Sequence, residues 1–294
     1  MDRERLGRQS LYQHNQQDRF PARNAASDLC RAAAFVATLA KTTASIAAQL
    51  AVKLPPLALG QRLAAARSCI GRGSVRFTTS FGLEDQAITH AITTNALDVD
   101  IVTIDTGRLF PETYDVWAQT EQRYGIRIQA VMPNRDRVEA FVGEHGINGF
   151  RASLQNRQTC CAIRKSEPLR RALVGAAAWI TGLRAEQSQH RSNTPLAEID
   201  EQHGLVKINP LADWSGQDVA RYIADNRIPY NVLHDRGFSS IGCAPCTRAV
   251  RVGEPERAGR WWWEADQKKE CGLHLRPAAA PQTAPSMTPE RELA

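Results

Sequence analysis

The feature that most constrains the fold of this chain is a regular alternation of strand-like and helix-like segments between residues 74 and 226. The strand-like segments are short runs rich in β-branched residues, at 74–79, 98–104, 126–132, 177–182 and 205–211. The helix-like segments lie at 111–125, 135–146 and 215–226. The first begins with a proline and the last with a Ser-x-x-Asp capping signature, both typical of helix starts. This alternation predicts an α/β fold in which helices flank a mostly parallel sheet.

Three loops that follow predicted strands hold the most polar chemistry: "SFGLED" (80–85), "DTGRLF" (105–110) and "TGLRAEQS" (181–188). Ligands of parallel sheets bind beyond the carboxyl ends of the strands, where these loops are expected to meet. The first loop passes through a glycine into a helix, and a helix N-terminus with a nearby hydroxyl, here Ser80, is an anion site. An ordinary strand–helix turn is the alternative interpretation.

Two adjacent cysteines, Cys160 and Cys161, pose a separate question. A disulfide between neighbours closes a very small, distorted ring, so a shared inorganic centre is the better interpretation. Cys243 and Cys246 supply two further thiols, and four thiolates are the usual ligand set of a [4Fe–4S] cluster. Structural zinc also takes four thiolates, but typically from two spaced pairs. Four unrelated buried cysteines are the remaining alternative. Cys30 and Cys69 lie in Ala-rich helical stretches, where burial is the default.

Two C-terminal motifs also carry chemistry. Cys271 in "KKECGLH" (268–274) stands beside lysines that favour its thiolate, but it also fits an unreactive tail cysteine. Arg257 and Arg260 in "ERAGRWWWE" (256–264) lie one helical turn apart, a spacing that suits a phosphate or sulfate. The three tryptophans that follow are interpreted as packing residues.

Composition limits the partners. The chain has a formal net charge of +6, and residues 1–70 hold 10 Lys/Arg against 4 Asp/Glu, so 27 of each sign balance in the rest. The body is therefore neutral, and no nucleic acid partner is expected. The sequence contains no uninterrupted run of about 18 apolar residues, so no membrane span is expected. Seven cysteines without the density of a disulfide scaffold predict a reducing, cytoplasmic location.

The same survey predicts five regions. They are a disordered extension (1–28), a helical region broken at "LPPL" (29–73), the α/β domain (74–250), a C-terminal segment (251–276) and a disordered Pro/Ala-rich tail (277–294). Gly253, Gly259 and Gly272 predict that the C-terminal segment moves as a lid over the α/β domain.

Taken in order, these motifs resemble the phosphosulfate reductase family, and most closely the iron–sulfur adenylylsulfate (APS) reductases of sulfate assimilation. The resemblance covers about residues 74–275 and includes the double cysteine, the CxxC pair, "RAGRWWWE" and "KKECGLH". It implies an adenine-nucleotide α-hydrolase-like (PP-loop) fold with a mobile C-terminal segment. "SFGLED" departs from the Ser-Gly-Gly-x-Asp-Ser pattern of ATP-splitting relatives, which counts against ATP cleavage.

The resemblance also implies a reaction and a set of site residues. APS is reduced to sulfite and AMP by thioredoxin, or a glutaredoxin-like reductant, through an S-sulfocysteine on Cys271. His274 is a candidate to orient or deprotonate that thiol, with packing as the alternative. Lys165, four residues after Cys161, is expected to reach both cluster and substrate. The implied substrate-binding residues, beside Lys165, are Ser80, Phe81, Gly82, Glu84, Asp85, Thr106, Gly182, Arg184, Arg191, Arg257 and Arg260.

Alternatives remain. The substrate is APS or its 3′-phosphorylated form, PAPS, and a homo-oligomer is possible. A cluster-containing, tRNA-thiolating ATP pyrophosphatase would need ATP cleavage and a basic tRNA surface. A non-catalytic metal-binding module, whose basic N-terminal arm contacts nucleic acid, would leave "ECGLH" and the arginine pair unexplained.

Overall fold

The structure of the chain, a computed structural model, describes residues 42–71, 73–264 and 273. The predicted extension (1–28), the predicted tail (277–294), Cys30, Cys271 and His274 lie outside the described residues. Among the described helices, none is both long and apolar enough to cross a membrane.

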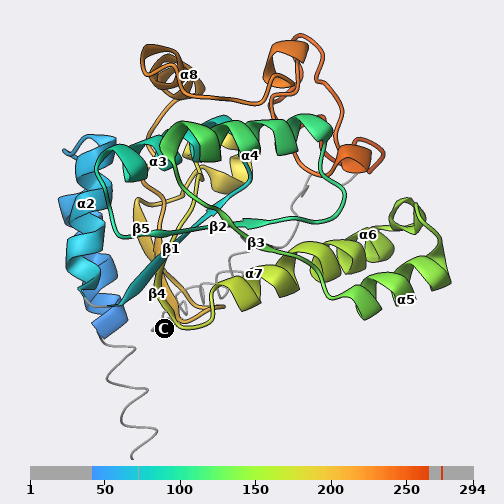
Figure 1. Cartoon of the computed structure of the whole chain (residues 1–294), viewed down its shortest axis with the longest axis horizontal. Helices are drawn as coiled ribbons and strands as arrows, with labels where there is room; N and C mark the ends of the chain where they lie inside the picture. The colour runs from blue at the N-terminus through green and yellow to red at the C-terminus, as the bar shows by residue number, and fades with distance from the viewer. Residues whose placement is uncertain (1–41, 72, 265–272, 274–294) are drawn as a thin grey trace, which may run out of the picture. The chain divides into compact units, whose positions relative to one another are not determined.

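The centre of the fold is a six-stranded sheet with the strand order β3-β2-β1-β4-β6-β5 (Figure 1). Its strands are β1 (Ser74–Thr79), β2 (Asp100–Ile104), β3 (Gln129–Val131), β4 (Ala176–Ile180), β5 (Ala197–Asp200) and β6 (Leu205–Ile208). Neighbouring strands run parallel except for β5, which pairs antiparallel with β6 at the edge. The predicted α/β class with a mostly parallel sheet is confirmed.

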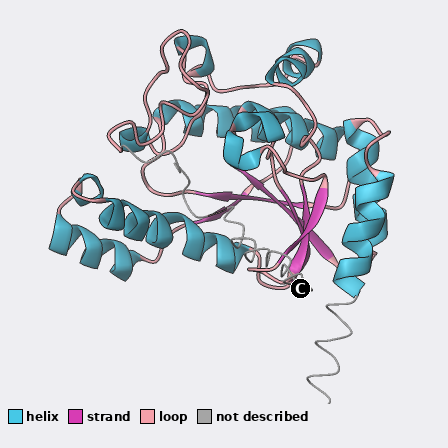
Figure 2. Cartoon of the chain, turned by 180° about the vertical axis from the view of Figure 1, so that it is seen from behind, coloured by secondary structure: helices cyan, strands magenta, loops and turns pink. Residues whose placement is uncertain are grey.

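Helices connect the strands and follow the chain in the predicted order (Figure 2). A helix over residues 42–53 comes first. The labelled helices are α2 (Leu59–Ile70), α3 (Leu83–Thr94), α4 (Pro111–Tyr124), α5 (Arg135–His145), α6 (Leu154–Cys161), α7 (Glu167–Ala172) and α8 (Gly216–Asp225). The short helical turns are η1 (Gly149–Arg151), the π-helical η2 (Ala162–Ser166), η3 (Ala185–Gln187), η4 (Gln189–Arg191), η5 (His234–Arg236) and η6 (Ala244–Cys246).

Helices cover both faces of the sheet. On one face α2, α3 and α8 share an apolar core with β1, β4 and β6, and that core includes Leu50 and Leu54 from the N-terminal helical region. On the other face α7 contributes Leu169, which packs against Trp179 of β4. Figure 1 shows α3 and α4 on one side of the strands and α7 on the other. This two-sided cover explains why β6 is buried at all four of its positions.

Local signals set several helix ends where the sequence predicted them. Pro111 occupies the first turn of α4, and Gly125 ends that helix in the left-handed conformation at φ +63°. Ser215 caps α8, because its side chain accepts a hydrogen bond from the backbone N–H of Asp218 while the Asp218 carboxylate accepts from the backbone of Ser215. "LPPL" (54–57) separates the first two described helices, as expected.

Two differences from the predicted elements have physical causes. The third strand is confined to Gln129–Val131, because the preceding Ile128 donates its N–H to the Glu121 side chain of α4 (2.8 Å) rather than to the sheet. The antiparallel edge strand β5 was not predicted. It exists only through its pairing with β6, which no local pattern reveals.

The strand order places a ligand crevice beside β1. Strands β2 and β3 follow on one side of β1, and β4 returns to pair with its other side. Connections that leave a parallel sheet in opposite directions open a crevice at the carboxyl ends of the strands. The loops "SFGLED" and "TGLRAEQS" flank this point.

Candidate active site

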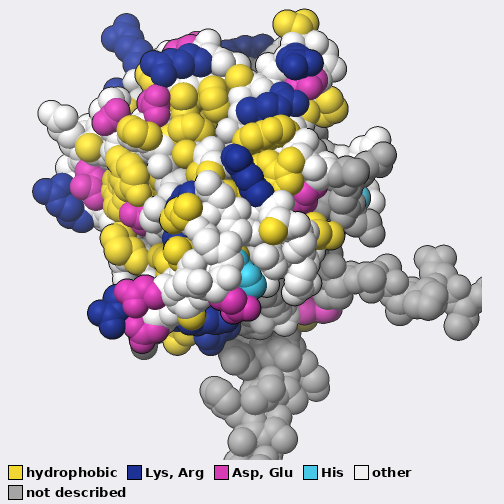
Figure 3. Space-filling model, turned by 90° about the vertical axis from the view of Figure 1, so that its right-hand side faces the viewer, with side chains coloured by type: hydrophobic (Ala, Val, Ile, Leu, Met, Phe, Trp, Pro, Cys, Tyr) yellow, Lys and Arg dark blue, Asp and Glu magenta, His cyan; other side chains and the backbone are white. Residues whose placement is uncertain are grey.

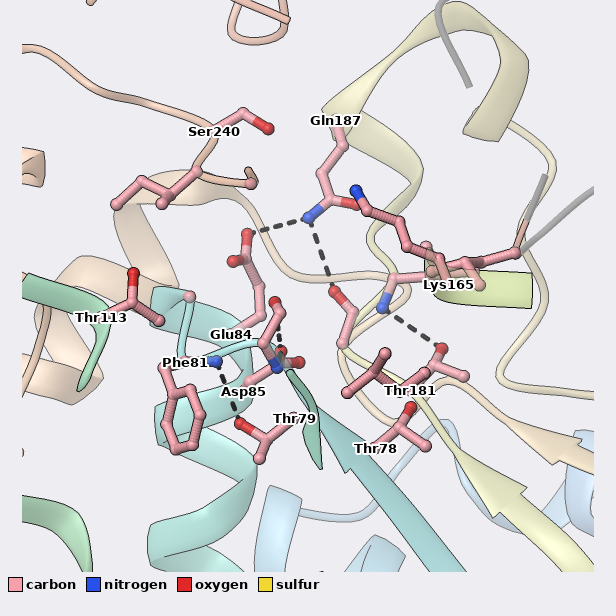
Figure 4. A pocket seen from close by; sticks show the side chains of 18 of the residues that line it. Thr78, Thr79, Phe81, Glu84, Asp85, Thr113, Lys165, Thr181, Gln187 and Ser240 are labelled. Carbon is pink, nitrogen blue, oxygen red and sulfur yellow. Dashed lines mark hydrogen bonds between the residues drawn. The ribbon is translucent and has the colours of Figure 1, made fainter. Parts of the chain in front are cut away.

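A cavity lies at the carboxyl ends of β1, β2 and β4 (Figure 4). The predicted substrate-binding residues that line it are Ser80, Phe81, Gly82, Glu84, Asp85, Thr106, Lys165, Gly182, Arg191, Arg257 and Arg260. Leu273 of the "KKECGLH" motif lines it too and packs against the cluster of Leu169 and Trp179. The structure therefore brings together side chains from segments far apart in the sequence.

Asp85 shapes the loop after β1. Its Oδ2 accepts hydrogen bonds from the backbone N–H of Ser80 (2.6 Å) and from the Ser80 hydroxyl (2.7 Å). Burial raises the pKa of Asp85 to about 7, although both hydrogen bonds from Ser80 favour the ionised form. Asp85 thus holds the loop through Ser80 and is a group that titrates near neutral pH.

Phe81 occupies the position at which ATP-splitting relatives carry a glycine. Its backbone adopts φ +61°, a conformation that favours glycine. The ring is buried, stacks on Trp117 at 5.4 Å between centroids, and packs with Val116 of α4. Burial of the aromatic ring offsets the backbone strain, so the tight turn is kept with a different residue.

Gly182 lets the loop after β4 approach the loop after β1. A Cβ atom at this position would lie 2.3 Å from the Asp85 Oδ1 and 3.1 Å from the Glu84 Cβ. Only glycine fits between these groups, because real Cβ atoms do not make such contacts. The pair of loops therefore depends on the absence of a side chain at residue 182.

Arg184 is placed differently from the other predicted nucleotide residues. It is 3% exposed and does not line the cavity. Its guanidinium binds Glu84 through Nε (2.7 Å), Glu186 through Nη1 (3.0 Å) and Glu256 through Nη2 (3.0 Å). Arg184 consequently ties the loop after β1 to the C-terminal segment.

Cationic side chains gather around Ser240, whose Oγ lies 3.4 Å from the Nη1 atoms of both Arg257 and Arg260. Arg260 is 6% exposed and also donates to the Ile241 carbonyl (3.3 Å), while its Nε has no hydrogen-bond partner among the described residues. A buried guanidinium with an unused donor suits an anionic ligand. Gly242 makes room for it, since a Cβ there would lie 2.3 Å from an Arg260 nitrogen.

The four predicted cluster cysteines line a second, smaller cavity. Cys160 and Cys161 end α6, while Cys243 directly precedes η6 and Cys246 ends it. Three of the thiols are buried and Cys160 is half-buried. The apolar walls come from Phe150 and Trp261, and the cationic walls from Arg108, Arg157, Arg164 and Lys165. No group of three or more His, Cys, Asp or Glu side chains within residues 42–71, 73–264 and 273 is arranged to hold a metal ion.

The two cavities share a wall made by Lys165 and Cys243. Burial alone would raise the pKa of the Cys243 thiol. Lys165, the Thr106 hydroxyl, and then Arg260 and Arg164, lower it below its ordinary value. The Thr106 Oγ1 lies 3.3 Å from the Cys243 Sγ and accepts the N–H of Arg108, so its own proton is available to the sulfur.

The loop after β2 supports this shared wall. The Thr106 carbonyl accepts a hydrogen bond from Arg164 (2.7 Å), and the Arg108 carbonyl accepts one from the N–H of Ala244 (2.8 Å). Asp105 holds the loop itself, because its Oδ1 accepts from the N–H of Gly107 (2.8 Å). The "DTGR" motif thus anchors both cysteine pairs to the sheet.

Trp261 closes the cysteine cavity from the C-terminal segment. It is fully buried with φ +42°, and its backbone N–H donates to the Cys246 carbonyl (3.1 Å). The guanidinium carbons of Arg157 and Arg260 lie 4.7 Å and 4.8 Å from its ring centroid. The tryptophan therefore has the predicted packing role, in the wall of the cysteine cavity.

The face beside this cavity mixes apolar and cationic groups. Figure 3 views the molecule from the side of α5 and α6 in Figure 1 and shows Lys and Arg side chains lying among exposed apolar ones. Arg151 contributes there, with its guanidinium carbon 5.4 Å from the ring centroid of Trp262, which is 38% exposed.

Sequence reasoning missed several polar lining residues, among them Gln187, His234, Ser240 and Glu256. Gln187 and Glu256 stand inside motifs that had been singled out, so their position was a usable signal. Gln187 donates to Glu84 (3.0 Å), as Figure 4 shows, and Arg191 donates to Gln187 (2.6 Å). His234 and Ser240 stand in the segment 228–250 that leads to the CxxC pair and shares the family resemblance, so their position was a usable signal too.

Fold and cavity together define a class of protein: an α/β domain with a mostly parallel sheet and, at the carboxyl ends of its strands, a cavity whose cationic side chains suit an anion. More specifically, the chain belongs to the phosphoadenosine phosphosulfate reductase domain family, whose model matches residues 74–249.

Individual relatives agree with this assignment. The chain is 51% identical over 256 residues to the adenosine 5′-phosphosulfate reductase of Agrobacterium fabrum, covering 86% of this chain and 97% of the relative. It is 50% identical over 224 residues to the protein of the same name from Allochromatium vinosum, covering 76% and 88%. The crystal structure of phosphoadenylyl-sulfate (PAPS) reductase from Candida auris, a phosphate complex, superposes with a TM-score of 0.59 at 30% identity, covering 69% of this chain and 96% of that one.

Proposed function

We propose that this protein reduces adenosine 5′-phosphosulfate to sulfite and AMP with electrons from a dithiol protein such as thioredoxin. The observation that carries the proposal is the shared wall, since Lys165 and Cys243 line both the anion cavity and the cysteine cavity. The names of relatives about half identical to this chain support APS as the substrate.

The first chemical step is assigned to Cys271. Its thiolate attacks the sulfate sulfur of APS, a sulfur–sulfur bond forms, and the bond from that sulfur to the bridging oxygen breaks. AMP leaves with the electron pair, and the enzyme carries an S-sulfocysteine. Leu273, two residues along the chain, lines the anion cavity, and two residues span at most about 7 Å.

The second step releases the product. A thiolate of the reductant attacks the Cys271 sulfur, and sulfite leaves with the electrons of the sulfur–sulfur bond. The second thiol of the reductant then displaces Cys271 from the mixed disulfide. The reductant is oxidised to its disulfide, the sulfate sulfur is reduced to sulfite, and Cys271 returns as a thiolate.

Cationic residues of the cavity are assigned to the phosphosulfate. Arg257, Arg260 and Lys165 would balance the charge that develops on the AMP phosphate as it leaves. Each charge-assisted hydrogen bond contributes about 1.5–3 kcal/mol. The unused Nε of the buried Arg260 supports this role.

We propose that Cys160, Cys161, Cys243 and Cys246 hold a [4Fe–4S] cluster. The fit rests on the donor set, because four thiols line one buried cavity whose walls carry cationic side chains that balance the negative charge of thiolate ligands. When bound, such a cluster would supply electrostatic and structural support beside Lys165 rather than the electrons, which come from the dithiol.

Mass spectrometry of the covalent adduct tests this function. Protein mixed with APS in the absence of reductant is expected to gain one sulfonate, about 80 Da, on Cys271, and thioredoxin is expected to discharge it. Cys271→Ser should form no adduct and no sulfite. The control Cys69→Ser changes a half-buried residue of helix α2, and it should keep both the adduct and the release of sulfite. An adduct that maps to another cysteine would refute the mechanism.

The same preparation separates the rival substrates. Sulfite release is measured with APS and with PAPS, because the Candida auris relative is named for PAPS. Pyrophosphate release from ATP is measured alongside, and no release is expected. Sulfite from neither phosphosulfate, with pyrophosphate from ATP, would favour an ATP-splitting enzyme instead.

A further inference from the structure

The anion cavity is electrically polarised. Lys165, Arg257 and Arg260 line it together with Cys243. Glu84 and Glu256 line the same cavity and are joined through Arg184, which binds both carboxylates. A nucleotide whose sulfated end lies against the cations therefore directs its sugar toward carboxylates.

The carboxylates outnumber the cation that joins them. Arg184 carries one positive charge and contacts Glu84, Glu186 and Glu256, which carry one negative charge each when ionised. Burial, and then the neighbouring Glu84, raises the pKa of Glu256 above its ordinary value, as expected when like charges share a poorly solvated site. This part of the cavity wall is therefore acidic.

Asp85 lines the cavity beside Glu84, and Arg257, the residue after Glu256, lowers the pKa of Glu256. Two further titratable groups, Arg191 and His234, face this region. Arg191 lines the cavity and donates to Gln187, which in turn donates to Glu84. His234 also lines the cavity, and burial lowers its pKa, so it adds little positive charge near neutral pH. Neither residue builds a second cluster of cations like the one formed by Lys165, Arg257 and Arg260.

We propose that Glu84 and Glu256 select the sugar of the substrate: they accept hydrogen bonds from free ribose hydroxyls and repel a 3′-phosphate. This inference rests on the proposed function and makes APS, rather than PAPS, the preferred substrate. Carboxylates are good acceptors for ribose hydroxyls. A phosphate placed against them would be desolvated beside like charges, which specific sites use to exclude a competitor.

The buried Arg260, whose Nε has no hydrogen-bond partner among the described residues, is an independent sign that the anionic end of the ligand binds beside Ser240. It orients the nucleotide, because only the phosphosulfate group, and not the ribose, matches a forked cationic donor. With that end placed, the acidic wall is left for the ribose and its 3′ position.

Nucleotide binding tests the inference without chemistry. The affinities of the cluster-containing protein for AMP and for adenosine 3′,5′-bisphosphate are measured by calorimetry, and AMP is expected to bind at least about tenfold more tightly. Glu256→Gln should reduce the ratio of the AMP affinity to the bisphosphate affinity about tenfold, because the bisphosphate binds more tightly. Glu84→Gln should change this ratio in the same direction. The kcat/KM ratio of APS to PAPS should follow the binding ratio.

Glu254→Gln is the matched control. Glu254 lies in the same segment and pairs with Arg248, but it does not line the cavity, so the ratio should stay at the wild-type value. Equal binding of both nucleotides to the wild type, or equal weakening of both by Glu256→Gln, would overturn the inference. In either case sulfite release from APS would leave the proposed function standing. Absence of sulfite from APS together with absence of nucleotide binding would remove both.

Discussion

Arg157 and Glu264 form a two-pronged ion pair across 107 residues of sequence, with nitrogen–oxygen distances of 2.9 Å and 3.0 Å. Their side chains are 2% and 8% exposed. Arg157 belongs to α6, one turn before the end that bears the cysteine pair, and Glu264 is the last residue of the described C-terminal segment before residue 273. The pair therefore fastens the segment that carries Arg257 and Arg260 to the helix that carries Cys160 and Cys161.

Glu264→Gln is expected to lower the free energy of unfolding by about 3 kcal/mol, because it leaves the Arg157 charge buried without its counter-ion. Chemical denaturation under anaerobic conditions measures the loss. Asp136→Asn is the comparison, since its pair with Arg135 is 82% and 76% exposed and should contribute less than about 1 kcal/mol. Equal losses in the two variants would contradict the assigned burial effect.

Asp85 predicts a pH dependence of stability. Its pKa is about 7 in the folded chain against an ordinary value of 3.8, so between these values the folded state binds a proton that the unfolded state has lost. Stability should therefore fall as pH rises through this window, by up to about 1.4 kcal/mol per pH unit. Asp85→Asn keeps a carbonyl acceptor for Ser80 and should flatten the profile between pH 5 and about 7. Parallel profiles for the two proteins would show that burial does not raise this pKa.

Cluster content gives a prediction that does not depend on activity. Protein purified without air should be brown and should contain about four irons and four sulfides per chain. Cys246→Ser should lose the visible absorbance, whereas Cys69→Ser should retain it. Stoichiometric zinc without labile sulfide would show instead that the four thiols bind a different metal.

Gly182→Ala should disrupt the anion cavity, because the new methyl group would meet Asp85 at 2.3 Å. The loops after β1 and β4 must move apart, with an expected loss of about 1–3 kcal/mol in stability and weaker binding of AMP. Gly143→Ala, within α5 and with no heavy atom inside 4 Å of the added Cβ, should instead be neutral or stabilising by up to about 1 kcal/mol. Calorimetric titration with AMP distinguishes the two variants.

Local patterns accounted for the fold class and for most of the cavity. Alternation of strands and helices predicted the sheet, and the loops after β1, β2 and β4 do meet where Ser80, Thr106 and Gly182 were expected. The joining of the four cysteines in one cavity was also anticipated. The sheet and the loops could be predicted because each segment carries its own pattern of strand, helix or turn residues.

Features that depend on contacts between residues far apart in the sequence could not be predicted. Arg184 was assigned to the nucleotide site, but its burial against Glu84 and Glu256 requires the C-terminal segment to return to the loop after β1. The role of Cys271 and His274, the lid motion and the predicted domain boundaries stay predictions. Edge strand β5 was missed for the same reason as Arg184, since its partner supplies the structure.

The π-helical turn at Ala162–Ser166 has a consequence for changes in chain length. A π turn contains about one residue more than an α turn, and each α-helical residue advances the helix by about 100°. Deleting one residue here would therefore act as a rotation rather than a shortening, and would swing the Cys160–Cys161 pair around the helix axis relative to α7. The number of residues between the cysteines and α7 sets the direction in which the thiols point around the helix axis. In this segment an insertion or deletion is therefore expected to be more disruptive than most substitutions.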